Sequence, residues 1–312
     1  MIILIYLAIK GRLGNQMFQY AFARALQEKL KTDILIDWHY VMDLNKNVPG
    51  SGFEDSLKFF NTKSYISTDV CEYKKYMSFY QFLIYRGYEK GFPYNSSIVD
   101  IQYYQNNFLK KCEKYGFYFY ENGFYNFDVN NIKKDKNLFL CGYYESTKYF
   151  SNIQNLIKQE FTPKNKRLAH NSKLYYEIEN SESVCVTIRR GDFVGNKFHE
   201  VCDMNYFLNG MDIIKSKVPN ARFFIFSNDV DWIRKNVKFK YPVIFEEGND
   251  PVWEKLRLMY SCKHFVISNS TFSWWAQYLS SNEKKIIVAP DRWFNSELKS
   301  DLLNNDDFIK IK

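Results

Sequence analysis

The chain has 312 residues, of which 46% are hydrophobic and 25% charged, a composition typical of a folded globular protein with one large or two medium domains. The net charge of +8 is compatible with an anionic ligand or surface, but the basic residues are scattered along the chain. A nucleic-acid-binding surface concentrates its basic residues on one element, so this distribution argues against nucleic acid as a partner. Six cysteines without a Cys-x-x-Cys pair indicate free thiols in a reducing compartment, and four scattered histidines predict no metal site.

The chain begins with an apolar run at residues 2–9. This run is too short to span a bilayer, which takes about 20 residues, and it lacks the basic start and the cleavage site of a signal peptide. We therefore interpret it as a strand buried on both faces of a sheet. This interpretation predicts a cytoplasmic protein, either free or lying peripherally on the inner face of the cell membrane.

The first half of the chain follows the pattern of an α/β sheet. Gly11–Gln16 is expected to form a turn, a helix with apolar residues at helical spacing is expected from Met17, and Ile34–Asp37 is expected to be a second strand. The stretch 65–127 is irregular and rich in Tyr and Phe, and it predicts short helices and loops. Asn137–Cys141 predicts a further strand, with a helix after it.

The same pattern restarts in the second half. Thr162–Arg167 is polar, basic and contains Pro163, which makes it the predicted linker and gives 1–163 and 164–312 as the two domains. Beyond it the expected strands are Val184–Ile188, Ala221–Phe226, Val243–Phe245, Phe265–Ser268 and Lys285–Val288, and the expected helices are Leu174–Ile178, Met204–Lys217, Val230–Asn236, Val252–Ser261 and Ser273–Ser280. Two successive units of this kind predict an α/β protein with two Rossmann-like domains that face each other across a cleft.

A pair of arginines follows the predicted strand at 184–188. In open α/β sheets, ligands bind beyond the carboxyl ends of the strands, and two adjacent arginines at such a position are costly unless an anion meets them. On an extended chain Arg189 and Arg190 point to opposite faces, so only one of them can enter a given site. The other arginine, or Asp192, would then orient it through an ion pair. A surface salt bridge is the alternative interpretation.

Three other polar clusters occupy equivalent places. The two glycines of Gly11–Gln16 permit a tight turn and a close backbone approach, with Asn15 at the helix start; a plain turn explains them equally well. Ser227-Asn228-Asp229 is explained most simply by helix capping, and a metal-binding role for the Asp229-Val230-Asp231 pattern is the weaker alternative. The hydroxyl and amide run of residues 268–273 predicts a phosphate site, because it combines hydroxyl donors with the amides of a helix N-terminus.

These motifs together resemble a known family. Gly-Arg-Leu-Gly-Asn-Gln at 11–16, Arg-Arg-Gly-Asp at 189–192, Phe-Ser-Asn-Asp with Trp232, and Asn-Ser-Thr-Phe-Ser-Trp-Trp at 269–275 are similar to those of bacterial α-1,2-fucosyltransferases, glycosyltransferase family 11. Gly-Tyr-Tyr-Glu-Ser at 142–146 resembles a further signature of that family. The matching motifs occur in the family's order from about residue 10 to 294.

The resemblance implies a GT-B fold with an N-terminal acceptor-binding domain, 1–163, and a C-terminal donor domain, 164–312. It implies transfer of L-fucose from GDP-fucose, with inversion and without a metal or other cofactor, to the 2-hydroxyl of a galactose-type sugar in an oligosaccharide or lipid-linked glycan. Arg189 would hold the β-phosphate, Asp192 would orient Arg189, and Asn15 would face the reacting centre. The residues expected to bind the donor are Gly14, Thr187, Arg190, Ser227, Asp229, Asn269, Ser270, Thr271 and Ser273. The aromatic stretch 65–127 is expected to shape the acceptor site.

The sequence leaves the general base open between His199, Glu200 and Asp192. It also departs from the family pattern at two positions: Thr187 stands where a histidine is usual, and Lys255 stands where an acidic residue is frequent. Both positions are expected near the donor's base. The alternatives are therefore the same chemistry with a different nucleotide-sugar donor, and a glycan-binding module without catalysis.

Overall fold

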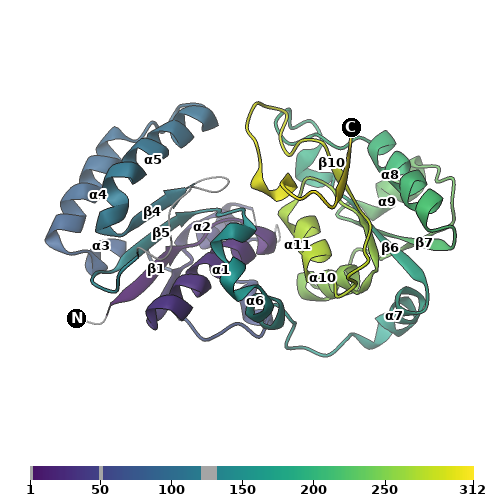
Figure 1. The fold of residues 1–312 in the computed structure, drawn as a ribbon, viewed down its shortest axis with the longest axis horizontal. Helices are drawn as coiled ribbons and strands as arrows, with labels where there is room; N and C mark the ends of the chain where they lie inside the picture. Colours follow the sequence, from purple (N-terminus) through teal and green to yellow (C-terminus); the bar gives the residue numbers. More distant parts are fainter. Residues whose placement is uncertain (1–2, 49–51, 121–131) are drawn as a thin grey trace. The chain divides into compact units, whose positions relative to one another are not determined.

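The computed structural model describes residues 3–48, 52–120 and 132–312 (Figure 1). They form two compact units, one made of Met1–Lys58 and Thr62–Glu160 and the other of Phe59–Asn61 and Phe161–Lys312. No helix among the described residues is long and apolar enough to cross a bilayer.

The first unit is built on a parallel sheet of five strands in the order β3-β2-β1-β5-β4. The strands are β1 Leu4–Ala8, β2 Asp33–Asp37, β3 Ile66–Thr68, β4 Phe117–Tyr120 and β5 Leu138–Gly142. All five residues of β1 are buried, which fits a central strand covered on both faces. The register pairs Ala8 with Asp37, so the loops that follow β1 and β2 begin side by side.

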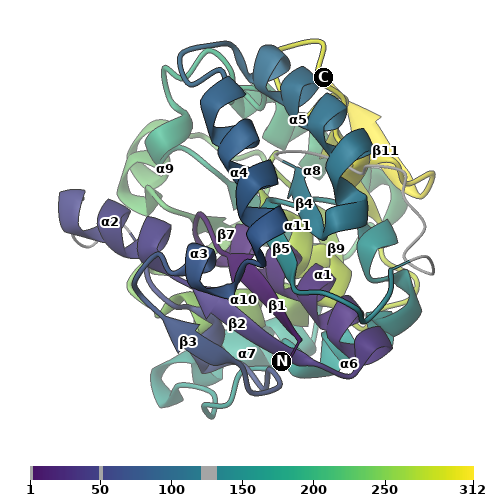
Figure 2. The same ribbon diagram turned by 90° about the vertical axis from the view of Figure 1, so that its left-hand side faces the viewer.

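Helices cover both faces of this sheet, as Figures 1 and 2 show. They are α1 Leu13–Leu30, α2 His39–Asn47, α3 Tyr73–Tyr76, α4 Phe79–Gly91, α5 Ile98–Cys112 and α6 Gln154–Glu160. On one face, rings of α3–α5 such as Tyr85 and Tyr88 pack against Tyr6, Phe117 and Phe119 of the sheet. Most of the aromatic residues in this stretch are therefore packing residues rather than a sugar-binding surface.

Three sequence-based expectations for this half need correction. α1 begins at Leu13, whose side chain is buried, so Gly14 and Asn15 lie in its first turn rather than in a loop. The stretch 65–127 contains two regular helices, α4 and α5, and the strand β4. The segment 162–167 differs from a free linker, because Pro163 pairs with Phe60 in the second unit.

The second unit contains a six-stranded sheet in the order β11-β10-β9-β6-β7-β8, again with parallel neighbours. Its strands are β6 Glu182–Ile188, β7 Ala221–Ser227, β8 Val243–Phe245, β9 His264–Val266, β10 Ile287–Pro290 and β11 Phe308–Ile311. β8 has the predicted bounds, and β6, β7, β9 and β10 differ from the prediction by one or two residues at one or both ends. The sequence interpretation missed the edge strand β11, which is half exposed and short.

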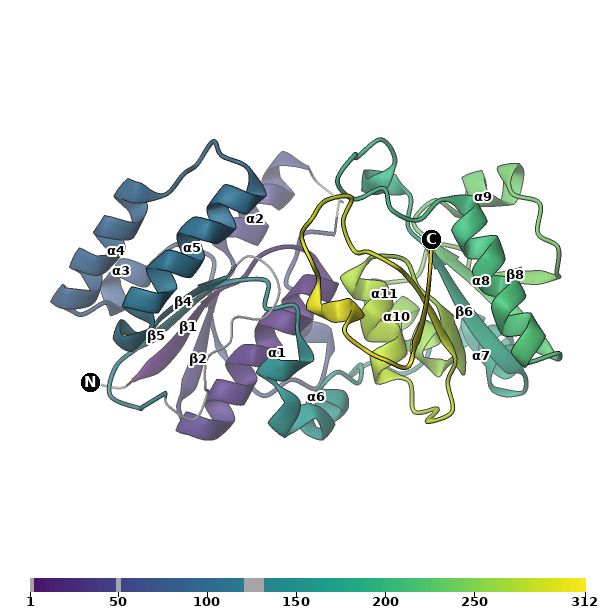
Figure 3. The ribbon, with the colours of Figure 1, turned by 45° about the horizontal axis from the view of Figure 1, so that its top comes forward.

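Five helices flank this second sheet (Figure 3). They are α7 Ser172–Glu179, α8 Met204–Lys217, α9 Val230–Asn236, α10 Val252–Ser261 and α11 Thr271–Leu279. α8, α9 and α10 have the predicted bounds because their apolar residues recur at helical spacing. Tyr206 and Met211 of α8 pack on Val184 and Val186 of β6, which fixes the strand that carries the arginine pair.

Candidate functional site

The two arginines at the end of β6 take different partners. Arg189 donates from Nη2 to Oδ1 of Asp192 at 2.6 Å, and its side chain is 25% exposed. Arg190 pairs through Nε with Asp229 at 3.2 Å, and its guanidinium lies 3.2 Å from the centre of the Trp232 ring. Arg189 also has an aromatic neighbour, since its guanidinium lies 5.5 Å from the centre of the Phe193 ring, but the Arg190 contact is much closer and Arg190 is the less exposed side chain, at 18%. Of the two arginines, Arg189 is the better placed to meet an anion.

The backbone between the arginines and Asp192 is held by Asn228, which follows β7. Its Oδ1 accepts the Arg190 amide at 2.9 Å. A Cβ atom at Gly191 would lie 2.1 Å from Nδ2 of Asn228, so only glycine fits beside this contact. Ser227 accepts the Asp229 amide at 3.0 Å and shapes the turn that presents both residues. Ser227 and Asp229 thus support Arg190, a role that leaves Asp229 engaged as a counter-ion.

His199 lies close to this group in an aromatic setting. Its ring stacks on Phe193 at 5.2 Å and meets Phe294 edge-on at 5.8 Å. Burial lowers the pKa of His199, and the nearby charge of Asp192 opposes that shift. Glu200 is exposed, and its carboxylate accepts the Gly195 amide at 3.1 Å. The structure therefore brings His199, Asp192 and Arg189 into one neighbourhood, while Glu200 supports the loop.

The polar run before α11 divides into a buried part and a part with partial exposure. Asn269 is 3% exposed and donates to the carbonyls of His199 and Trp293, both at 2.9 Å. Ser273 is also buried and lies 3.0 Å from the hydroxyl of the wholly buried Ser268. Ser270 and Thr271, at the N-terminus of α11, are partly exposed. A phosphate at this helix end would meet Ser270 and Thr271, whereas Asn269 and Ser273 hold the loop in place.

Thr187, the departure from the family pattern, faces the interior of the sheet edge. It is 4% exposed, donates to the carbonyl of Val266 at 3.4 Å and accepts the Ser268 amide at 3.1 Å. The hydroxyl thus ties β6 to the loop that leads into α11. This use of Thr187 explains how a small polar residue fits here without a ligand.

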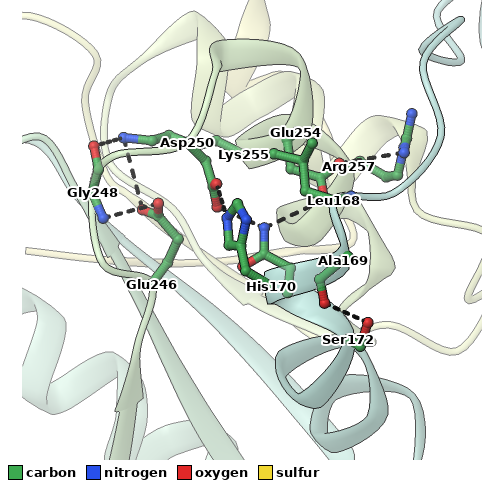
Figure 4. Close-up of polar contacts among 11 residues, drawn as sticks. Leu168, Ala169, His170, Ser172, Glu246, Gly248, Asp250, Glu254, Lys255 and Arg257 are labelled. Carbon is green, nitrogen blue, oxygen red and sulfur yellow. Dashed lines mark hydrogen bonds and ion pairs between the residues drawn. The ribbon is translucent and has the colours of Figure 1, made fainter.

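A second departure, Lys255, lies in the first turn of α10 and reaches the segment that follows β8 (Figure 4). Its ammonium donates to the carbonyl of Gly248 at 2.6 Å and lies 3.8 Å from the buried carboxylate of Glu246. Burial raises the pKa of Glu246, and the Lys255 charge opposes that shift. The adjacent Glu254 is wholly buried and accepts the Leu168 amide at 2.9 Å. Lys255 therefore neutralises an internal acid, and Glu254 fixes the loop before α7.

A cavity of about 630 Å³ opens on the α7 side of β8. It is lined in part by His170, Phe245 and Asp250, and the imidazole of His170 lies 2.7 Å from Asp250. No residue of the Arg189 or Ser270 groups lines this cavity. It is thus a separate feature of the second unit.

In the first unit, the side chains of two buried glutamines hydrogen-bond to the backbone of the turn after β1. Gln16 donates to the carbonyl of Gly11 at 3.0 Å, and Gln19 donates to the carbonyls of Lys10 and Asn15 at 2.8 and 2.9 Å. Gly11 has φ +73°, a conformation that favours glycine. Asn15 is partly exposed at the start of α1, and Gly14 is buried there. The sequence therefore folds a rigid turn that presents Asn15 at the carboxyl edge of the sheet.

Sequence reasoning missed Asp37, the last residue of β2. Its side chain is wholly buried, yet it accepts a hydrogen bond from Tyr6 and contacts His39. The signal was available, because a carboxylate ending an apolar strand breaks the pattern at the edge where ligands bind.

The carboxylates of the second unit are engaged by cations. Asp192, Asp229 and Glu246 pair respectively with Arg189, Arg190 and Lys255. Within the described part of this unit, no three His, Cys, Asp or Glu side chains group together as metal ligands.

Comparisons with known proteins agree with this geometry. Residues 4–311 match the model of Glycosyl transferase family 11. An alpha-1,2-colitosyltransferase from Escherichia coli is 30% identical over 297 residues, covering 93% of this chain and 92% of the relative. The O-antigen biosynthesis glycosyltransferase WbnK, also from Escherichia coli, is 30% identical over 311 residues, covering 95% and 97%.

A solved structure gives the fold. The fucosyltransferase NodZ from Bradyrhizobium aligns with a TM-score of 0.52 over 88% of this chain and 91% of its own, at 12% identity. This likeness and the two parallel sheets confirm the predicted GT-B fold.

Proposed function

This chain belongs to glycosyltransferase family 11, and from that premise we propose that it transfers L-fucose from GDP-fucose to the 2-hydroxyl of a terminal galactose-type sugar. The family match over residues 4–311 makes it a glycosyltransferase. The donor, the acceptor, the inversion and the absence of a metal are parts of the proposal. The observation that carries it is the position of Arg189 at the end of β6, within a chain that matches this family throughout.

The names of two relatives support the linkage. One is an alpha-1,2-colitosyltransferase. A second, from Caenorhabditis elegans, is a galactoside 2-alpha-L-fucosyltransferase, 26% identical over 192 residues and covering 58% of this chain and 51% of its own. Both names specify attachment at a 2-hydroxyl. The shared linkage favours the same regiochemistry here.

The donor domain proposed is the second unit. Arg189 grips the β-phosphate with its planar fork, and Asp192 positions that fork. Ser270 and Thr271 at the N-terminus of α11 bind phosphate or ribose oxygens. Six further residues hold the loops of the site in position without binding the donor directly: Asn269, Ser273, Thr187, Ser227, Asp229 and Arg190.

The reaction is a displacement at the anomeric carbon of fucose. The acceptor oxygen forms a bond to that carbon from the face opposite the phosphate, and the bond between the carbon and the β-phosphate oxygen breaks. GDP leaves with the electron pair, and the hydroxyl proton passes to a base. Arg189 stabilises the negative charge that grows on the departing diphosphate, which removes the need for a metal ion.

A second candidate keeps this chemistry and changes the donor sugar. Colitose is L-fucose without its 3-hydroxyl, and a relative that covers nearly the whole chain is named for colitose. Thr187 on β6 and Lys255 on α10 also depart from the family pattern. An enzyme that uses colitose would have no hydrogen-bonding partner for the 3-hydroxyl of fucose. The rates with GDP-fucose and GDP-colitose therefore distinguish the two candidate functions.

The acceptor we propose is a sugar chain of a surface glycan, assembled on a lipid at the inner face of the cell membrane. The relative WbnK is named for O-antigen biosynthesis, which favours an acceptor of this kind. The first unit would bind it, with Asn15 directed to the reacting centre. The protein would work in the cytoplasm or peripherally on that membrane.

The test is to incubate the protein with GDP-fucose or GDP-colitose and a terminal β-galactoside, with and without EDTA. We expect an α-1,2-linked product, identified by NMR, and an unchanged rate with EDTA. A preference for GDP-colitose by more than about tenfold in kcat/KM, or about 1.4 kcal/mol, would support the second candidate. The absence of transfer and of GDP stabilisation in a thermal-shift assay would contradict both.

A further inference from the structure

A buried carboxylate and a histidine form a pair at the carboxyl edge of the first unit's sheet. Asp37, the last residue of β2, is wholly buried, and its Oδ1 lies 2.7 Å from Nδ1 of His39. Its Oδ2 accepts the Tyr6 hydroxyl at 2.5 Å. A carboxylate can only accept hydrogen bonds, so Nδ1 of His39 is the donor in this contact, and in the neutral ring the lone pair then lies on Nε2.

Helix capping explains only part of this arrangement. The Asp37 carboxylate also accepts the His39 amide at 3.0 Å, which satisfies one free donor at the start of α2. That bond needs neither the imidazole contact nor the Tyr6 hydroxyl on the other oxygen. Those two bonds fix the carboxylate from both sides and set the tautomer and orientation of the His39 ring.

The ring remains accessible at Nε2. The His39 side chain is 15% exposed, and no described residue hydrogen-bonds Nε2. His39 lies beside the turn that carries Asn15: Ile9, just before the turn, donates its amide to the Asp37 carbonyl at 3.0 Å. Lys10 of that turn places its ammonium 5.6 Å from the ring centre of Tyr40. His39 and Asn15 therefore lie in the first turns of α2 and α1, two helices that start at the same edge of the sheet.

We propose that His39 accepts the proton of the acceptor hydroxyl and that Asp37 positions it. This inference rests on the proposed transfer. It names as the base a residue other than His199, Glu200 and Asp192, the three candidates that the sequence left open. As the sugar oxygen forms its bond to the anomeric carbon, its proton moves to Nε2. The imidazolium so formed is stabilised by Asp37 and later releases the proton to solvent.

The charged and titratable neighbours of the ring come from four elements. They are Asp37 on β2, Tyr6 on β1 with Lys10 beyond it, Tyr40 on α2 and Cys71 after β3. Asp37 is the acidic side chain in contact with the ring. Burial raises the pKa of Tyr6, and the electrostatic effect of Cys141 together with burial raises the pKa of Tyr40, so both stay neutral at physiological pH.

A metal ion is the rival occupant of this corner. One ligand atom each from Asp37, His39 and Cys71 lies within 4.8 Å of the others. Two observations favour the hydrogen-bonded pair. Oδ1 of Asp37 and Nδ1 of His39 are 2.7 Å apart, the distance of a hydrogen bond, and Oδ2 of Asp37 already accepts the Tyr6 hydroxyl.

The experiment compares His39→Gln and Asp37→Asn with the unchanged enzyme. We expect His39→Gln to lower kcat for transfer about 10²–10³-fold with little change in donor KM, and to abolish the acidic limb of the pH–rate profile. Asp37→Asn should lower kcat while leaving the donor KM nearly unchanged, because the imidazolium formed during transfer loses its counter-ion and the ring loses its fixed orientation. Imidazole added to His39→Ala should restore part of the rate. The matched control is His170→Gln, which alters an Asp-paired histidine of the second unit and should leave the profile unchanged.

Two measurements separate the possible failures. The stabilisation of the protein by GDP in a thermal-shift assay reports both folding and an intact donor site. If GDP does not stabilise the unchanged enzyme, the proposed function itself is wrong. If the His39 variants retain GDP stabilisation, the acidic limb and kcat within about threefold, the inference is wrong while the function stands. A rate lost equally with EDTA or Cys71→Ser would replace the base with a metal site.

Discussion

The guanidinium of Arg190 lies 3.2 Å from the centre of the Trp232 ring. With the ion pair to Asp229, this contact holds Arg190 in place, while its neighbour Arg189 pairs with the half-exposed Asp192 and is the more exposed of the two arginines. A cation–π contact of this kind contributes about 1–2 kcal/mol when it is partly shielded from water.

Replacing Trp232 should therefore weaken donor binding without touching the donor. We expect Trp232→Ala to raise the dissociation constant for GDP about tenfold, which corresponds to about 1.4 kcal/mol. Trp232→Phe, which keeps an aromatic face, should stay within about threefold. Isothermal titration of GDP measures both. Equal weakening in the two variants would show that the cavity left by the indole, rather than the cation–π contact, matters.

Arg189 should carry the largest single effect on the chemical step. We expect Arg189→Ala to lower kcat about 10²–10³-fold, because the developing charge on GDP loses its partner. Arg189→Lys retains the charge but loses the planar fork, and should recover only part of that loss. The control Arg222→Ala removes an exposed ion pair with Glu177 and should leave kcat unchanged. An Arg189→Ala enzyme with normal kcat would exclude this phosphate contact.

Gly191 provides a test of the loop geometry. Gly191→Ala would place Cβ 2.1 Å from Nδ2 of Asn228, whose Oδ1 holds the Arg190 amide. The loop must shift, and we expect a loss of about 1–3 kcal/mol in unfolding free energy together with weaker GDP binding. Gly195→Ala is the matched control, because φ there is also positive, +77°, but nothing lies within 4 Å. Urea unfolding and GDP titration of both variants separate the clash from the backbone strain.

Glu28 gives the first unit a pH-dependent contribution. Hydrogen bonds from Lys31 and Arg24 lower the pKa of Glu28 to about 2. A depressed carboxyl pKa stabilises the fold above the unfolded value of 4.5, and this stabilisation is lost as the pH falls through about 2. Glu28→Gln should thus lower the unfolding free energy by about 1 kcal/mol at pH 7.

The difference between Glu28→Gln and the unchanged protein should shrink as the pH falls from about 4.5 towards 2. Urea unfolding at several pH values measures it. A difference that is constant over this range would show that the substitution acts through packing instead of charge.

The pattern of strands and helices was readable where burial imposes a period. α8, α9, α10 and β8 have the predicted bounds, since their apolar residues face one core. β4 was missed although its four residues are all buried, because an unbroken run of Phe and Tyr shows neither the alternation of a half-buried strand nor the usual Val and Ile of a buried one. The bounds of α4 and α5 were not predicted either, because exposed rings such as Phe79, Tyr80 and Tyr103 interrupt the polar faces that would mark the helical period.

The site could be predicted in its positions but not in its internal contacts. The carboxyl-end rule located Arg189, Asn15 and the run before α11. It could not show that the side chains of Asn269 and Ser273 are buried, because the residue type alone does not tell whether a polar side chain of this loop points inward or outward. The same rule, applied to β2, would have located Asp37; the helix that follows it was not recognised, and so its first residue, His39, was overlooked.

The three residues Phe59–Asn61 pair with Thr162–Lys164 and belong to the second unit, although they lie within the sequence of the first. The polypeptide thus passes from one unit to the other three times rather than once. A single cut near residue 161 would strip the second unit of a segment that its backbone hydrogen bonds require. Residues 161–312 expressed alone should therefore not fold stably. Coexpressed fragments should assemble only when residues 59–61 are part of the same fragment as 161–312.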